Sequence, residues 1–148
     1  MEPARDTTPR WHYRCDNFHR AHGLLREAVE LMRERTLSPL EQEGAIQRFE
    51  YCWELAWKTL KDYLEHQGVQ LPIVTPAAVL RAAQAAGVID QGEGWMRMLD
   101  TRNKLAHTYD FKAFAAALEA VRQEFFGLLD ALHDRLFEER LGRGGVGP

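Results

Sequence analysis

The stretch that decides the fold is Pro39-Leu-Glu-Gln-Glu-Gly-Ala-Ile-Gln-Arg-Phe-Glu-Tyr-Cys-Trp-Glu-Leu-Ala-Trp-Lys-Thr-Leu-Lys-Asp-Tyr-Leu-Glu-His-Gln67. Its apolar residues recur every three or four positions, which predicts one long amphipathic helix over residues 39–67. A first apolar strip consists of Ile46, Phe49, Trp53, Ala56, Leu60 and Tyr63, and a second strip beside it of Cys52, Trp57 and Leu64. Two strips mean contact from two directions. The helix is therefore either the centre of a bundle or packs one strip against a second subunit.

Other helices are expected around this one. Ser38-Pro39 and Thr75-Pro76 each place a capping side chain before a proline, a signal of helix starts. The apolar spacing predicts helices over residues 13–35, 77–86, 93–107 and 111–140. No segment alternates apolar and polar residues for long enough to predict a strand. We therefore expect an all-α fold, an antiparallel helical bundle of four main helices plus one short helix.

The chain length of 148 residues suits one domain. We expect a bundle domain over residues 10–140, a flexible leader at 1–9 and a disordered, glycine-rich tail at 141–148. No apolar run approaches the length of a membrane span, and the first residues lack the apolar core of a signal peptide. Cys15 and Cys52 lack the spacing of a disulfide framework, so we interpret them as reduced thiols in a cytoplasmic protein.

The charge balance is slightly acidic, with 19 Lys and Arg against 22 Asp and Glu and a net charge of −3. Proteins that capture nucleic acid over a broad surface normally carry a basic surplus. Any RNA contact must therefore come from a local cluster, and the expected ligand is a few nucleotides of RNA or a single nucleotide.

The chemistry-bearing residues lie in Asp100-Thr-Arg-Asn-Lys-Leu-Ala-His-Thr-Tyr-Asp110. On a helix, Asn103 and His107 share a face, and Asp100 lies one turn earlier. Arg102 is about 140° round the helix from His107. The two side chains can meet on one ligand only if Arg102 reaches across, if the helix ends near His107, or if a second subunit completes the site. This geometry suggests a homodimer.

RNA cleavage without a metal needs a base near neutral pKa and a cation for the transition state. His107 suits the first role, and Arg102 suits the second, because a guanidinium holds two phosphate oxygens at once. Asn103 could orient the imidazole or bind phosphate, and Asp100 and Lys104 are candidate substrate-binding residues. The plain alternative is that these side chains only cap the helix end and form ion pairs.

The pattern Arg-Asn-x-x-x-His-x-Tyr at residues 102–109 resembles the signature of HEPN domains, the all-helical partners of minimal nucleotidyltransferases. Three further segments are similar to the branch of nucleotidyltransferase substrate-binding proteins: Arg10-Trp-x-Tyr-x-x-x-x-Phe18, the run from Gln42 to Leu64, and Gly94-Trp-Met-x-Met-Leu-Asp100. The resemblance implies a homodimeric, metal-independent endoribonuclease toxin that a separate nucleotidyltransferase partner neutralises, with Arg102 and His107 at the subunit boundary. It also implies that Tyr109 can accept AMP, against the alternative that Tyr109 only packs a helix corner.

A second function remains open, that of a non-catalytic subunit that holds the nucleotide or acceptor for the partner. The chain itself lacks a Gly-Ser pair followed by an Asp-x-Asp motif, so we do not expect it to be the transferase. We expect no cofactor and no metal, because Cys15, His19 and His22 on one helix have no evident fourth ligand. Glu50, Glu54, Lys58 and Asp62 are interpreted as a solvated ladder of ion pairs, and Trp53, Trp57 and Trp95 as core or interface residues.

Overall fold

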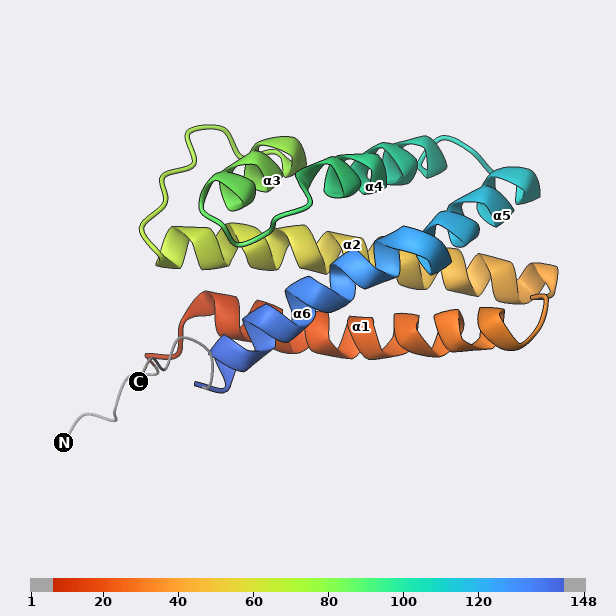
Figure 1. The fold of residues 1–148 in the computed structure, drawn as a ribbon, viewed down its shortest axis with the longest axis horizontal. Helices are drawn as coiled ribbons and strands as arrows, with labels where there is room; N and C mark the ends of the chain where they lie inside the picture. The colour runs from red at the N-terminus through yellow and green to blue at the C-terminus, as the bar shows by residue number, and fades with distance from the viewer. Residues whose placement is uncertain (1–6, 143–148) are drawn as a thin grey trace.

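The long helix predicted over residues 39–67 forms as α2 (Pro39–His66) in the computed structural model, which describes residues 7–142 (Figure 1). The other elements are α1 (Arg10–Glu34), α3 (Pro76–Ala85), α4 (Gly92–Leu105), α5 (Phe111–Ala120), the π-helical turn η1 (Val121–Phe125) and α6 (Phe126–Arg140). Residues 7–142 contain no strand, which confirms the all-α class for this part of the chain. Most of the expected leader and tail, residues 1–6 and 143–148, lies outside the described residues.

The ends of α2 follow from local chemistry. The Ser38 hydroxyl accepts a hydrogen bond from the Glu41 N–H at 3.2 Å, and the Glu41 carboxylate accepts one from the Ser38 N–H at 2.9 Å. This capping box satisfies N–H groups that a helix start otherwise leaves unpaired. Gly68 follows the last turn with φ +85°, a backbone conformation that side chains with a Cβ rarely adopt.

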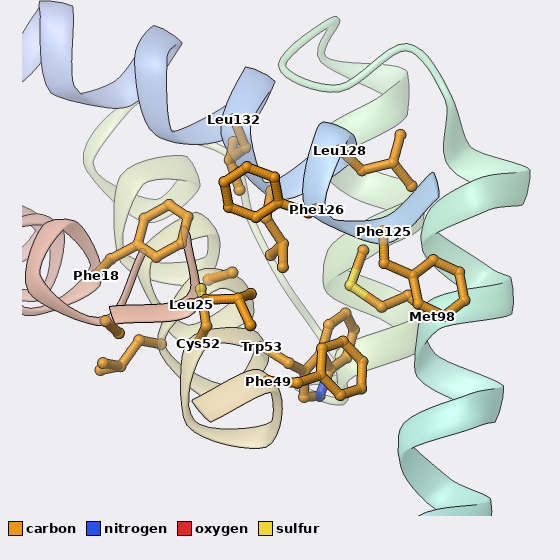
Figure 2. Close-up of a cluster of buried hydrophobic side chains, with 14 of the residues drawn as sticks. Phe18, Leu25, Phe49, Cys52, Trp53, Met98, Phe125, Phe126, Leu128 and Leu132 are labelled. Carbon is orange, nitrogen blue, oxygen red and sulfur yellow. The ribbon is translucent and has the colours of Figure 1, made fainter. Parts of the chain in front are cut away.

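Helix α2 is the centre of the bundle. It contacts α1, α3, α5 and α6, and Figure 1 shows α1 along one side of it and α3 and α4 along another. Its two apolar strips are buried within the single chain, apart from the half-buried Trp57. Figure 2 shows Phe49, Cys52 and Trp53 of α2 directed into the same core as Phe18 of α1 and Phe125 of η1. The sequence left two roles open for this helix, the centre of a bundle or a contact with a second subunit. The structure shows that α2 is the centre of the bundle.

The single helix predicted over residues 111–140 is wrong in one respect, because η1 interrupts it between α5 and α6. A π-helical turn accommodates one residue more than an α-helical turn. Two consecutive aromatic residues, Phe125 and Phe126, are both buried at this point, one near Phe49 and the other stacked on His22 with ring centroids 5.3 Å apart. A regular α-helix would turn one of them further from the core, which gives a physical reason for the wide turn.

The sequence also predicts whether the tryptophans and Asp62 are buried. Trp53 and Trp95 are core residues, as predicted, with ring centroids 6.2 Å apart between α2 and α4. Asp62 is not part of a solvated ladder, because its carboxylate is buried and accepts a hydrogen bond from Arg14 at 2.9 Å. Among the described helices, none combines the length and apolar character needed to cross a bilayer.

Candidate active site at the end of helix α4

The candidate residues occupy the last turn of α4 and the connector to α5. Helix α4 ends at Leu105, two residues before the predicted boundary, and the His107 N–H donates to the Lys104 carbonyl in a closing turn at 3.3 Å. His107 therefore does not continue the helical face of Asn103 and Asp100. The helix thus ends near His107, which is one of the three arrangements that would let His107 share a ligand with Arg102.

Arg102 is half-exposed and faces the acidic side of α2. Its guanidinium lies 3.6 Å from the Glu54 carboxylate, and Glu54 also pairs with Lys58 at 3.2 Å. The predicted ion pair between Glu54 and Lys58 is thus present. A second, long contact of 3.5 Å joins the Arg102 guanidinium to the Asn103 side-chain oxygen. Arg102 and Asn103 are brought together, while part of the positive charge of Arg102 is neutralised within the chain.

Lys104 and Asp100 also pair with each other. Their charged atoms lie 3.0 Å apart across one helical turn, and both side chains are well exposed. An exposed pair of this kind contributes little to stability, so either side chain can leave it to bind a ligand at low cost.

His107 is exposed, and within residues 7–142 its imidazole has no hydrogen-bond partner. No hydrogen bond or ion pair among the described residues joins it to Arg102. An imidazole without a partner can accept or donate a proton at either ring nitrogen. A single copy of the chain thus presents the two groups five residues apart, without a hydrogen bond between them.

Tyr109 is 76% exposed and projects from the connector. Its hydroxyl donates to the Glu43 carboxylate of α2 at 2.7 Å, and this hydrogen bond, with partial burial, raises the pKa of the phenol above its ordinary value. Its ring meets the edges of Phe111 and Phe114 at 6.3 and 5.4 Å. Tyr109 thus packs at the helix corner, as the plain interpretation expected, and still leaves most of its surface accessible.

Two hollows flank α4, one beside its last turns and one beside its first and middle turns. One, of about 230 Å³, lies between α4 and α5 and is lined by Thr101, Lys104, Thr108 and alanines of α5. The other, of about 530 Å³, lies between α3 and α4 and includes Arg97 and Asp100. Their sizes suit a small ligand, and the larger one lies within the range of small-molecule pockets.

Sequence reasoning missed the acidic partners of the motif. Glu43 and Glu54 lie on α2, and nothing in the local pattern around residues 100–110 indicates that they face Tyr109 and Arg102. The four-residue spacing of the acidic side chains on α2 was a usable signal only for contacts within that helix.

An all-helical bundle that carries Arg-Asn-x-x-x-His-x-Tyr at the end of its fourth helix defines a HEPN-type domain. The chain belongs to the family described as "Nucleotidyltransferase substrate binding protein like", whose profile matches residues 13–138.

The chain is also similar to individual proteins, in sequence and in structure. It is 34% identical over 70 residues to the "Probable ribonuclease HepT" of Haemophilus influenzae. That match covers 45% of this chain and 48% of the relative, so the chain spans about half the length of the curated relative. A crystal structure of a protein from Thermus thermophilus superposes with a TM-score of 0.70 at 30% identity, over 80% of this chain and 98% of the other.

Proposed function

We propose that the chain is the HEPN component of a two-protein module with a minimal nucleotidyltransferase, and that it acts as a homodimeric, metal-independent endoribonuclease toxin that its partner neutralises. The observation that carries this proposal is the accessible imidazole of His107, which has no hydrogen-bond partner among residues 7–142 and lies two residues beyond the end of the helix that carries Arg102. The similarity to a protein named as a probable ribonuclease supports the same function.

The chemistry follows from the two side chains. His107 removes the proton from a ribose 2′-hydroxyl, whose oxygen then attacks the adjacent phosphorus. The bond to the 5′ oxygen breaks, that oxygen takes a proton from solvent, and the products are a 2′,3′-cyclic phosphate and a 5′-hydroxyl. Arg102 stabilises the charge that grows on the phosphate oxygens, while Asn103 orients the guanidinium or the phosphate. A second copy of the chain would bring its own imidazole and guanidinium to the same site.

Tyr109 supplies a point of control. Its exposed ring is accessible to a partner enzyme. The phenol oxygen would attack the α-phosphorus of ATP held by that enzyme, the bond to the β-phosphate would break with release of pyrophosphate, and the hydrogen-bonded Glu43 carboxylate would accept the phenolic proton. An AMP group on Tyr109 would place a phosphate close to the end of α4. It would compete there with the RNA phosphate for Arg102 and Lys104, which would inactivate the site.

A second function is favoured by one observation. Arg102 pairs with Glu54 and Lys104 pairs with Asp100, so the site carries little net positive charge for RNA capture. This arrangement suits a non-catalytic subunit that binds a nucleotide or acceptor for the partner transferase, which is also what the name of the family describes.

The two functions are separated by incubating the purified protein with total tRNA and a mixed RNA pool in EDTA. Wild-type protein is expected to leave 2′,3′-cyclic phosphate ends, His107→Ala none, and the control His66→Ala, an exposed histidine on α2, the same ends as wild type. Intact RNA with a well-folded wild-type dimer would rule out the ribonuclease. In that case Arg102→Ala should weaken nucleotide binding instead.

A further inference from the structure

The crossing of α1 and α6 brings together three potential metal ligands, His22, Asp130 and His133, and places a fourth, His19, against His133. Helix α1 supplies His19 and His22 at a spacing of three residues, and α6, which runs in the opposite direction, supplies Asp130 and His133 at the same spacing (Figure 1). His22 Nε2 lies 2.8 Å from Asp130 Oδ1, and His19 Nδ1 lies 2.7 Å from His133 Nε2. One ligand atom from each of His22, Asp130 and His133 lies within 4.8 Å of the others.

A second carboxylate orients one of these rings. Asp134 Oδ1 lies 3.1 Å from His133 Nδ1, so this nitrogen carries the proton that is donated to Asp134. The lone pair of His133 is then on Nε2, the atom that faces the cluster. Histidines that bind metals usually donate their other ring N–H to a carboxylate or carbonyl in this way, which fixes the tautomer and raises the basicity of the ligand.

The surroundings of His22 and His133 hold these two rings in place and favour their neutral form. His22 and His133 are buried and stacked, with ring centroids 4.0 Å apart, and Phe126 and Phe137 stack against His22 and His19. Burial lowers the pKa of His22 to about 4 and also lowers the pKa of His133, so both rings are neutral at physiological pH. Neutral imidazole is the form that binds a metal.

Access and charge also allow an ion to enter. His19 is exposed and the Asp130 side chain is 37% exposed, so the cluster opens to solvent on one side. The Arg26 guanidinium lies 3.2 Å from Asp130 Oδ1 and would repel a cation, but its side chain is 49% exposed and can turn outward. The acidic groups Asp130 and Asp134 remain to balance the charge of a dication.

We propose that His19, His22, Asp130 and His133 form a binding site for a divalent transition metal, with Zn²⁺ the best match. Three imidazole nitrogens and one carboxylate oxygen form a ligand set that suits tetrahedral Zn²⁺. At ligand distances of about 2.0–2.1 Å, tetrahedral ligand atoms lie about 3.3 Å apart. The two close pairs, at 2.7 and 2.8 Å, must therefore open by about half an ångström. The wider separations in the cluster, up to 4.8 Å among His22, Asp130 and His133, must close. The His22 and His133 rings rotate out of their stack to direct both nitrogens at one ion.

Such an ion would cross-link α1 and α6. Its ligands lie on different elements from the motif of α4 and α5, so the proposed metal is structural and takes no part in the metal-independent cleavage. It also differs from what the sequence led us to expect, because the two ligands of α6 are more than a hundred residues away from His19 and His22 along the chain.

The test is a Zn²⁺ titration of untagged, EDTA-stripped protein in competition with a chromophoric chelator. We expect one Zn²⁺ per chain and, when Co²⁺ replaces it, the intense visible absorption of four-coordinate cobalt. His19→Ala, at an exposed position that tolerates truncation, should weaken the affinity by at least about tenfold. Asp134→Asn, which only removes the orienting carboxylate, should weaken it by roughly 10–100-fold.

Matched controls are His66→Ala and His107→Ala, two exposed histidines outside the cluster, and neither should change the affinity. The proposal is overturned if stripped wild-type protein takes up no Zn²⁺, if bound Co²⁺ has the weak spectrum of six-coordination, or if His66→Ala weakens binding as much as His19→Ala does. Because His107→Ala abolishes only the proposed cleavage, failure of the metal site and failure of the ribonuclease are distinguishable.

Discussion

Lowering the pH tests what stabilises the contact between α1 and α6. Among the groups of this contact, His22 has the most strongly lowered pKa. Burial, reinforced by the neighbouring His133, lowers the pKa of His22 from 6.5 to about 4, although the hydrogen bond to Asp130 opposes this shift. The unfolded chain therefore binds a proton at His22 more readily than the folded chain does. The stability that the neutral ring contributes is complete above pH 6.5 and is lost as the pH falls towards 4.

The magnitude follows from the two pKa values. Between about pH 7.5 and about pH 5, linkage predicts a loss of about 2 kcal/mol of unfolding free energy from His22, with about 3 kcal/mol as the limit below its folded pKa. Solvent does not appreciably screen this effect on the free energy of unfolding, because His22 is only 1% exposed. The charged and titratable groups that face the ring are Arg26 on α1 and Asp130 and His133 on α6. His133 has a lowered pKa as well and adds to the loss in the same direction.

The assay is urea denaturation in EDTA at several pH values between about 7.5 and 5, followed by circular dichroism. His22→Gln keeps a donor for Asp130 and removes the titrating ring, so its stability should vary less with pH by about 2 kcal/mol over this range. His66→Gln, a change at an exposed position, should retain the full pH dependence of wild type. If His22→Gln and wild type lose stability in parallel, or if wild type gains stability on acidification, the assignment to His22 is refuted.

Three further predictions concern α2 and the motif. Replacing Glu54 by Gln removes the acidic partner of Arg102, an exposed pair worth about 0.2–1 kcal/mol, so nucleotide or RNA affinity measured by fluorescence anisotropy should rise up to about fivefold. Ser38→Ala removes the N-cap of α2 and should cost about 1 kcal/mol in urea denaturation, whereas an unchanged midpoint would contradict the capping argument. Glu43→Gln removes the carboxylate that raises the pKa of Tyr109, so the phenol pKa should fall towards 10.0; NMR titration of labelled tyrosine, with Tyr109→Phe for assignment, measures it.

The helices were predictable because their signals are local. The cap-and-proline pairs at Ser38 and Thr75 lie within four residues of the backbone N–H groups that they satisfy. The apolar spacing that predicted a helix over residues 111–140 is local as well, and the apolar residues at that spacing are buried: Phe114, Leu118, Val121, Phe125, Leu132 and Leu136. The π-helical turn was not predictable in this way, since it depends on where Phe125 and Phe126 find space against α1 and α2.

The candidate site was only half predictable. The motif residues could be named from their types and order, because an arginine, an imidazole and a phenol within eight residues carry recognisable chemistry. Their partners could not, and the contacts of Arg102 and Tyr109 with α2 emerged only when that helix was packed against the motif. The roles of these residues in cleavage and modification remain predictions that the RNA experiment tests.

By itself, the sequence determined the all-helical class, the helix starts and the family motif. It also showed that the helix over residues 39–67 has two apolar strips. Each of these features depends on periodicity and hydrogen bonds within a few residues. Only the tertiary structure decided that Glu54 restrains Arg102, that Asp62 is buried, and that His19 and His22 meet Asp130 and His133. The physical reason is that contacts between helices depend on the angle and register at which they pack. Those are set by the whole core at once, not by any one segment.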